Sequence, residues 1–310
     1  MHQQLPHSAN NPATPSRISP GSFTLLSNFS TSLAANFSGQ DTILKEFCVN
    51  VLENQNLNIT FTQSQDYKDS YAFINVIEIV SMPPDLYYTT VTGETTELPF
   101  VGQAPGAQFS LSNSNALEMV YRANVGGKSI SAGNDIGLYR AWSGNEDWFQ
   151  KDYPSTLPVN LSLQPSFSLI HNYSAPVSVY QTAKSMSTDN QTNQKYRLTW
   201  VFPVDSMFTY LVRLHFCEFE LEITVYGNRV FEIHIADQIA EKKTDVIGWS
   251  GGNGVPVYKD YDVMIGSKAK QNKQNLSIAL YPSLAYMTNY INAILNGVEI
   301  FKVDSSRSPA

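Results

Sequence analysis

The stretch Arg197–Cys217, RLTWVFPVDSMFTYLVRLHFC, decides the fold class. Large apolar residues alternate with other residues on both sides of Pro203 and of the turn-forming pair Asp205-Ser206. A period of two puts the large apolar side chains on one face, which predicts two β-strands joined by a turn. Two half-buried strands this close in sequence predict an antiparallel sheet with one face in solvent. We therefore expect this stretch to pack in the core of a β-sandwich.

The composition agrees with an all-β protein and argues against several functions. Of the 310 residues, 12% are aromatic and 15% are charged. This composition is rich in residues that favour strands and poor in those that form surface helices. The formal net charge of -7 argues against a nucleic-acid partner, because binding to a phosphate backbone needs a basic surface. No run of about 18 apolar residues occurs, so we expect no membrane span in this chain. Residues 1–22 are polar and Pro-rich and do not resemble a signal peptide.

Glycosylation sequons point to the secretory pathway all the same. In the predicted strands, Asn58 and Asn275 fall on the solvent-facing side, where a glycan needs to be. We therefore expect an extracellular glycoprotein whose leader peptide is not part of this chain. The two cysteines, Cys48 and Cys217, lie in apolar stretches, which favours buried thiols over a disulfide bridge. The predicted glycosylation sites are Asn28, Asn36, Asn58, Asn160, Asn172, Asn190 and Asn275.

An internal repeat suggests two related modules. Residues 72–79, AFINVIEI, match residues 293–300, AILNGVEI, and residues 56–61 match residues 275–280. The predicted modules share a C-terminal half, and the first lacks most of the N-terminal half that contains Arg197–Cys217 in the second. The predicted organisation is a disordered leader (1–22), a partial first module (23–101), a linker (102–112), a second module (113–303) and a tail (304–310).

Motifs for catalysis, nucleotides and metals are missing from the sequence. Val125–Ser129, VGGKS, resembles the end of a phosphate loop, but Arg122 stands where that motif requires Gly. We expect His215 and His234 to be solvated strand residues, and we predict no metal and no cofactor. Kinase motifs and a G-x-S-x-G elbow are absent, whereas a pair of distant carboxylates, as in glycosidases, stays open. Three acidic residues on one strand face are expected to form a solvated edge: Glu218, Glu220 and Glu222.

The best candidate binding site is Tyr121–Trp142, YRANVGGKSISAGNDIGLYRAW. It combines aromatic rings, amides and charged groups with glycines that let a ligand approach the backbone. Carbohydrate sites use such sets, because sugar C–H faces stack on rings while hydroxyls need hydrogen bonds. A structural loop whose Gly and Asn residues form turns is the alternative. The predicted ligand-binding residues are Tyr121, Arg122, Asn124, Gly126, Gly127, Asn134, Asp135, Arg140 and Trp142.

Several motifs in their order resemble one known family. They include YRANVGG at residues 121–127, PVD at 203–205, YLVRLHFCE at 210–218 and NAILNGVEI at 292–300. Together with FTLLSNF at residues 23–29, they are similar to the malectin-like ectodomain of plant receptor-like kinases of the FERONIA/THESEUS type. The resemblance covers residues 23–303.

The resemblance implies two tandem malectin-like antiparallel β-sandwiches of jelly-roll type, the first incomplete. It implies a non-catalytic, cell-wall-sensing module at the plasma membrane that takes part in signalling. The implied partners are pectin-type cell-wall polysaccharide and secreted rapid alkalinization factor peptides with a GPI-anchored co-receptor. The family's membrane helix and Ser/Thr kinase domain are not found in this chain. The alternatives are a carbohydrate-active enzyme on a β-sandwich and a non-functional receptor fragment.

Overall fold

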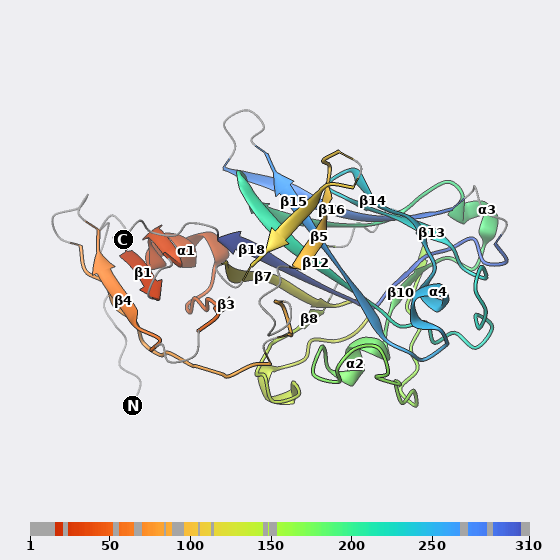
Figure 1. Ribbon diagram of the computed structural model, residues 1–310, viewed down its shortest axis with the longest axis horizontal. Coiled ribbons are helices and arrows are strands. Elements are labelled where there is room, and N and C mark those ends of the chain that lie inside the picture. The colour runs from red at the N-terminus through yellow and green to blue at the C-terminus, as the bar shows by residue number, and fades with distance from the viewer. Residues whose placement is uncertain are drawn as a thin grey trace. The chain divides into compact units, whose positions relative to one another are not determined.

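The computed structural model describes residues 16–20, 24–51, 56–64, 70–83, 85–88, 96–104, 106–112, 115–144, 148, 154–266, 272–283 and 288–304. The described residues form mostly β-strands with a few short helices, as the all-β prediction requires (Figure 1). The chain divides into two compact units. The first unit comprises Met1–Ile79, Ser114–Glu118 and Asp304–Ala310, and the second comprises Val80–Asn113 and Met119–Val303.

The second unit contains a four-stranded sheet in the order β11-β16-β13-β14 and a larger sheet with the order β7-β18-β12-β15-β5-β6. A small sheet has the order β17-β10-β9. Most of these strands pair antiparallel, whereas β15 pairs in parallel with β5 and β7 pairs in parallel with β8. The strands are β5 (Thr96–Val101), β6 (Gln108–Leu111), β7 (Ala116–Asn124), β8 (Ser143–Gly144), β9 (Ser155–Thr156), β10 (Lys184–Met186), β11 (Leu198–Asp205), β12 (Phe208–Phe216), β13 (Phe231–Ile235), β14 (Gln238–Thr244), β15 (Val257–Ile265), β16 (Lys273–Pro282), β17 (Ile294–Leu295) and β18 (Gly297–Asp304). The helices are η1 (Ala132–Asn134), α2 (Val177–Tyr180), α3 (Asn190–Asn193) and α4 (Val246–Ser250).

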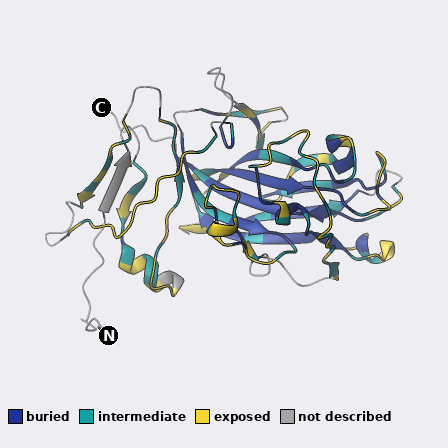
Figure 2. Ribbon diagram, turned by 90° about the horizontal axis from the view of Figure 1, so that it is seen from below, coloured by how far each residue is buried: buried dark blue, intermediate teal, exposed yellow. Residues whose placement is uncertain are grey.

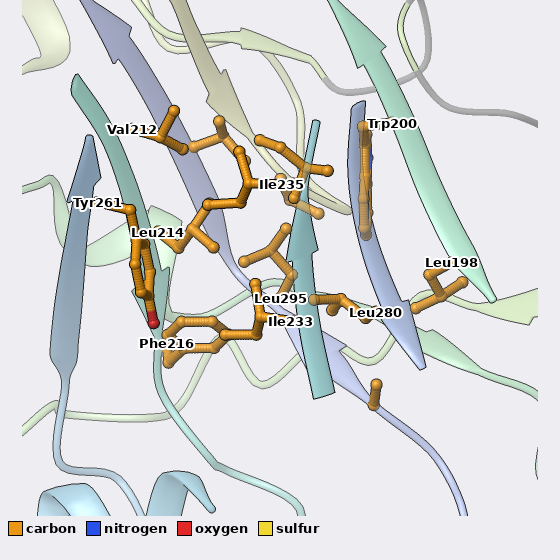
Figure 3. Close-up of a cluster of buried hydrophobic side chains, with 14 of the residues drawn as sticks. Leu198, Trp200, Val212, Leu214, Phe216, Ile233, Ile235, Tyr261, Leu280 and Leu295 are labelled. Carbon is orange, nitrogen blue, oxygen red and sulfur yellow. The ribbon is translucent and has the colours of Figure 1, made fainter. Parts of the chain in front are cut away.

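The core of the second unit lies between its two main sheets. Leu198 and Trp200 of β11 face Val212, Leu214 and Phe216 of β12 across this core (Figure 3). Each of these side chains is at most 1% exposed, and the strands of this unit are mostly buried (Figure 2). The alternation in the sequence therefore predicted both strands and their buried face correctly.

The pairing of these two strands differs from the prediction. Strand β11 pairs with β16, whereas β12 pairs with β15 and β18. The turn at Asp205-Ser206 therefore carries the chain from one sheet to the other, and no hairpin forms. The outer face of β12 is buried as well, because Leu211, Arg213 and His215 are each at most 2% exposed. The prediction of a single sheet with one wet face was wrong for this stretch.

Residues 217–230 also differ from the prediction. They form no strand, so Glu218, Glu220 and Glu222 do not share the predicted strand face. Glu218 is fully buried and pairs with Arg229 at 2.5 Å, which contradicts a solvated acidic edge at this residue. Burial raises the pKa of Glu218, and the Arg229 charge opposes that rise. Glu220 is partly exposed and also reaches Arg229, at 3.0 Å.

The first unit contains one helix and a small antiparallel sheet in the order β2-β1-β4. Ser30 caps the helix by accepting a hydrogen bond from the Leu33 N–H, and Gly39 ends it in the left-handed conformation. Lys45 pairs with Glu118 beside the contact between β3 and β7. The elements of this unit are β1 (Ser16–Pro20), β2 (Leu26–Phe29), α1 (Thr31–Ser38), β3 (Phe47–Cys48) and β4 (Ile59–Gln63).

Three segments deviate from the predicted domain plan. Ser16–Pro20 forms β1, although the sequence predicted a disordered leader there; residues 1–15 and 21–22 lie outside the described residues. Gln108–Leu111 forms β6, although 102–112 was expected to be a linker. Residues 72–79 repeat the sequence of residues 293–300, which form β17 and part of β18, but residues 72–80 belong to no strand. Cys48 and Cys217 are buried and form no disulfide bridge, as favoured from the sequence.

Candidate functional site

Charged residues line the outer face of the larger sheet in the second unit. Arg122 of β7, Arg213 and His215 of β12, and Glu299 of β18 alternate with core residues and therefore point away from the core. All four are at most 2% exposed. Tyr87, Leu86 and Tyr180 hydrogen-bond to members of this set, and Arg140 is joined to them through the Tyr87 hydroxyl. Segments 86–87, 135–142 and 173–180 therefore cover this face of the sheet. We call these four side chains, together with the side chains of the neighbouring segments that bond to them, the buried charge network.

Glu299 is the centre of the buried charge network. Its carboxylate accepts hydrogen bonds from the Tyr87 hydroxyl at 2.6 Å, Arg122 Nε at 2.8 Å and His215 Nε2 at 3.1 Å. Burial alone would raise its pKa, but the His215 hydrogen bond and the Arg122 charge hold the pKa well below the ordinary value. Glu299 is therefore ionised at every physiological pH.

His215 joins Glu299 to helix α2. Burial lowers the pKa of His215 despite the neighbouring carboxylate, so the imidazole is neutral near pH 7. Its Nε2 lies beside Glu299 and its Nδ1 lies 2.9 Å from the Tyr180 hydroxyl. These partners assign the proton to Nε2, because the carboxylate can only accept and the tyrosine can donate. The predicted solvated position of His215 was wrong.

Arg140 fastens one covering loop to another. Its Nε and Nη2 bind the two oxygens of Asp135 at 2.9 and 3.2 Å. Its remaining donors reach the carbonyl oxygens of Ser174 at 3.0 Å and Tyr173 at 2.9 Å. The guanidinium is planar and its donors have fixed directions. These contacts therefore hold residues 135–140 and residues 173–174 in a fixed position relative to each other.

Trp142 is enclosed by the same network. Its ring lies 5.7 Å from the Arg122 guanidinium and 5.8 Å from that of Arg140. His215 meets it edge-on at 5.6 Å. With 1% of its surface exposed, this indole offers no face to a sugar.

Arg213 extends the network to β15. It forms two 2.7 Å hydrogen bonds with the Asp260 carboxylate and lies 3.8 Å above the Tyr258 ring. Its third contact is a 2.6 Å hydrogen bond to the Leu86 carbonyl. These contacts hold residues 85–88 against the centre of the sheet, so the role of Arg213 is structural.

The structure brings four predicted site residues together: Arg122, Asp135, Arg140 and Trp142. Their side chains are at most 4% exposed, so they do not form an open binding surface. For these four, the structural interpretation of the stretch fits the observed contacts better than direct ligand contact.

The other predicted residues lie elsewhere. Tyr121 points to the opposite side, where it packs on Phe202 and donates to the Pro203 carbonyl at 2.7 Å. Asn124 bonds to the Lys128 carbonyl and to Thr182. A Cβ atom at Gly126 would lie 1.9 Å from the Ala183 carbonyl oxygen, and one at Gly127 would lie 2.2 Å from the Asn124 amide nitrogen. These glycines serve close backbone packing.

Exposed residues of the same stretch form its outer surface. Asn134 is exposed at the end of η1, and Tyr139 is 62% exposed. Tyr139 has φ of 54°, a left-handed conformation that is strained for a bulky residue. It directly precedes Arg140, whose backbone N–H donates to Asp135 at 3.0 Å. The network thus holds an exposed aromatic ring in a conformation that the chain would otherwise avoid.

Most members of the network give no signal in the sequence. Tyr87, Tyr180 and Asp260 carried no local signal, because their partners are 35 to 212 residues away in sequence. Glu299 could have been found through the repeat, in which Glu78 and Glu299 align.

No group of His, Cys, Asp or Glu in the described part of the chain could hold a metal ion. No helix among the described residues is both long and apolar enough to span a membrane.

Comparison with known proteins identifies the family. The model of the malectin-like domain matches residues 9–303. The chain belongs to the malectin-like family. It is 42% identical over 294 residues to the receptor-like protein kinase FERONIA of Arabidopsis thaliana, covering 93% of this chain and 31% of FERONIA. It is 31% identical over 287 residues to THESEUS 1 of the same plant, covering 91% of this chain and 30% of that relative.

Solved malectin-like structures share the fold. The crystal structure of the plant receptor-like kinase FER matches with a TM-score of 0.83 and 41% identity, covering 95% of this chain and 73% of that one. The extracellular domain of ANXUR2 from Arabidopsis thaliana matches with a TM-score of 0.85 and 30% identity, covering 95% and 74%. A structure of the peptide RALF23 with FER and LLG2 matches at 42% identity, covering 95% and 75%. The chain spans about a third of the length of its curated malectin-like relatives.

Proposed function

We propose that this chain is a non-catalytic extracellular receptor module that binds a secreted signalling peptide together with a membrane-anchored co-receptor. The observation that carries the proposal is the likeness, at 42% identity over 95% of this chain, to the structure of RALF23 with FER and LLG2. Identity at this level over nearly the whole chain favours a shared mode of recognition. The proposed place of the module is the outer face of the plasma membrane, in cell-wall sensing.

The geometry of the second unit suits a binding platform. The network holds the covering segments 85–88, 135–142 and 173–180 by side-chain contacts that reach buried groups of the sheet. Loops on a rigid sheet lose little conformational entropy when they bind a partner. The acidic residues of the network each engage a cationic or hydroxyl group, so we assign them structural roles and no catalysis.

Equilibrium binding to a RALF23-type peptide tests the proposal. The secreted chain is titrated with the peptide alone, with LLG2 alone and with both, by calorimetry. We expect weak binding of either component alone and tight binding of the pair. The control is a titration of the same chain with LLG2 and a peptide of scrambled sequence. If the chain binds neither the peptide nor the mixture at concentrations where FER does, the proposal fails.

A cell-wall polysaccharide is the second candidate ligand, and the strained Tyr139 favours it. Tyr139 is 62% exposed, and Asn134 of the same loop is exposed as well; aromatic faces and planar polar groups are what sugar-binding sites use. The test is binding of pectin-derived oligosaccharides to the chain and to Tyr139→Ala. We expect at least a tenfold loss of affinity in this variant. Tyr226→Ala, at an equally exposed tyrosine, is the matched control. Equal binding by all three proteins would remove the carbohydrate site from this position.

A further inference from the structure

Asp262 of β15 is a buried acid without a partner. It alternates with Tyr261 and Val263 of the core, so its side chain points to the face that carries the buried charge network. The residue is 0% exposed, and neither of its carboxylate oxygens has a hydrogen-bond donor among the described residues. An unpaired charge is costly to bury, so the folded chain favours the neutral acid at this position.

The charges on this face balance without Asp262. Each buried guanidinium group there is paired with one carboxylate, and His215 is neutral near pH 7 because burial lowers its pKa. The pairs are Arg122–Glu299, Arg140–Asp135 and Arg213–Asp260. Ionisation of Asp262 therefore adds a negative charge for which no further buried cation stands on this face in the described part of the chain.

Apolar side chains flank Asp262 in the sheet. Leu211 of β12 is its partner in register on one side and Phe100 of β5 on the other, and Phe301 of β18 stands opposite Leu211. The nearest ionisable groups come from β15, β12 and the covering segment 85–88. They are Tyr258, Asp260, Arg213, Asp85, Tyr87 and Tyr88.

Arg213 is the cation that an ionised Asp262 can reach. It stands opposite Asp260 in the register, and Asp262 is the next residue of β15 on the same face. Diagonal neighbours of an antiparallel pair are within reach of long side chains. Two carboxylates then compete for one guanidinium, whose donors already serve Asp260 and the Leu86 carbonyl.

Residues 85–88, which we call the strap, depend on Arg213 for their attachment to the sheet. The Leu86 carbonyl accepts the 2.6 Å hydrogen bond from Arg213 Nη1, and the Tyr87 ring lies 5.0 Å from the guanidinium. Tyr87 also packs on Phe301 at 4.6 Å and donates to Glu299. Movement of Arg213 toward Asp262 removes the Leu86 bond and one of the contacts of Tyr87.

We propose that Asp262 is a proton-controlled latch: its neutral form keeps the strap closed over the sheet, and its ionisation draws Arg213 away from Leu86 and opens the strap. The proton passes from the Asp262 carboxyl to solvent, and Arg213 compensates the charge that forms. Opening the strap uncovers the buried charge network. The proposal is independent of peptide binding by this chain.

Burial sets the direction of the latch. It raises the pKa of Asp262 to about 8 in the closed state, with a smaller contribution from Asp260. An open strap admits water, which returns the pKa toward its ordinary value of 3.8. Opening is therefore least favourable below about pH 4, becomes more favourable as the pH rises to about 8, and is constant above that.

Amide exchange of the full chain tests the latch. Deuterium uptake of the peptide that contains residues 85–88 is measured from pH 5 to pH 9, and each rate is divided by the rate of the unstructured peptide at the same pH. We expect the opening constant of the strap to rise about tenfold per pH unit up to about pH 8 and then to level off, because one proton is released on opening. The peptide that contains β13, in the other main sheet, is the internal control and should show no such rise.

Substitutions at Asp262 isolate the titrating group. Asp262→Asn and Asp262→Leu carry no ionisable side chain, so opening of the strap should be independent of pH in both. The leucine variant also avoids burying an unpaired amide. Asp205→Asn, at an exposed acid, is the matched control and should keep the pH dependence of the wild type.

The variant Asp260→Asn tests the role of Arg213. It leaves Asp262 to pair with this guanidinium, so Asp262 is ionised in the closed state and releases no proton on opening. We expect the increase in strap opening between pH 5 and pH 8 to be at least tenfold smaller than in the wild type. An unchanged increase would show that Arg213 is not shared between the two acids, and would overturn the latch.

The wild type and the Asp262 variants give the remaining contradictions. Strap opening that does not change with pH in the wild type would remove the proposal, as would a wild-type pH dependence in Asp262→Asn. An equal rise in exchange at β13 would mean that the whole unit opens together, without a separate strap. None of these measurements uses the peptide, so their failure is distinguishable from failure of the proposed function.

Discussion

At the residue scale, the buried charge network depends on Glu299. Three donors converge on its carboxylate, and removing the charge leaves Arg122 buried without its counter-ion. We expect Glu299→Leu to lower the free energy of unfolding by about 3–5 kcal/mol, because an unpaired buried charge is costly. Urea denaturation monitored by tryptophan fluorescence measures the change.

An exposed ion pair provides the control for Glu299. Asp205 binds Lys273 at 3.0 Å, but the two side chains are 42% and 48% exposed. Asp205→Asn should therefore cost less than about 1 kcal/mol. Equal losses in the two variants would show that the network adds no more than a surface ion pair does.

Asp262 of β15 makes the stability depend on pH. It is 0% exposed, and neither carboxylate oxygen has a hydrogen-bond partner among the described residues. Burial, with a smaller contribution from Asp260, raises its pKa to about 8. The folded state thus favours the protonated acid, whereas the unfolded chain ionises near the ordinary value of 3.8. Stability attributable to this group is highest below about pH 4, falls as the pH rises to about 8, and is constant above that.

The variant Asp262→Asn removes this titration. We expect the wild type to lose stability relative to the variant by the order of 1 kcal/mol per pH unit between about pH 4 and 8. Thermal unfolding of both proteins across that range is the measurement. A stability difference that does not change with pH would mean that Asp262 is solvated or paired in solution.

At the element scale, the sequence predicted the strands better than their partners. The alternation in β11 and β12 gave the correct core face, since local periodicity depends on one strand alone. Pairing depends on distant segments: β11 meets β16, and β12 meets β15 and β18. For the same reason His215 and Arg213 were assigned to solvent or left unexplained, because the loops that cover them are remote in sequence. Residues 72–80 show the converse, a strand pattern that pairs with no strand in the described part of the chain.

The turn after β7 is expected to be intolerant of a side chain. At Gly126, φ is 74° and an added Cβ would collide with the Ala183 carbonyl. Gly126→Ala should therefore destabilise the protein by about 3 kcal/mol or more, from strain and displaced backbone together. Gly137→Ala isolates the strain, because φ is 87° there and nothing lies within 4 Å of the added atom. We expect a loss of about 1–2 kcal/mol in that control; similar values for both would mean that the loop at Ala183 yields.

At the scale of the whole molecule, the sequence pointed to part of the buried charge network, and the binding site stays a prediction. The stretch Tyr121–Trp142 does supply Arg122, Arg140 and Trp142 to one cluster, but burial makes them supports of a surface. The residue types in this stretch indicate which hydrogen bonds and ion pairs its side chains can form. Their access to solvent depends on how residues 85–88 and 173–180 fold over the sheet. Local patterns carry no information about such cover.

The exposure of each sequon asparagine predicts whether it carries a glycan. Six of the seven Asn residues are exposed, and Asn160 is half-buried with its amide oxygen bonded to Ser162 at 2.8 Å. We expect glycans at the six exposed positions and lower occupancy at Asn160 when the chain is secreted from plant cells. Mass spectrometry after glycosidase treatment measures occupancy at each site. Full occupancy at Asn160 together with vacancy at exposed sites would contradict the role of accessibility.

The proposed function is recognition of a secreted peptide by this malectin-like chain, and a measurement of ternary binding tests this proposal. Immobilised chain is exposed to a RALF23-type peptide in the presence and absence of LLG2. We predict that LLG2 and the peptide each increase the affinity for the other at least tenfold on this chain. Retention of neither component, under conditions where FER retains both, would contradict the proposed function.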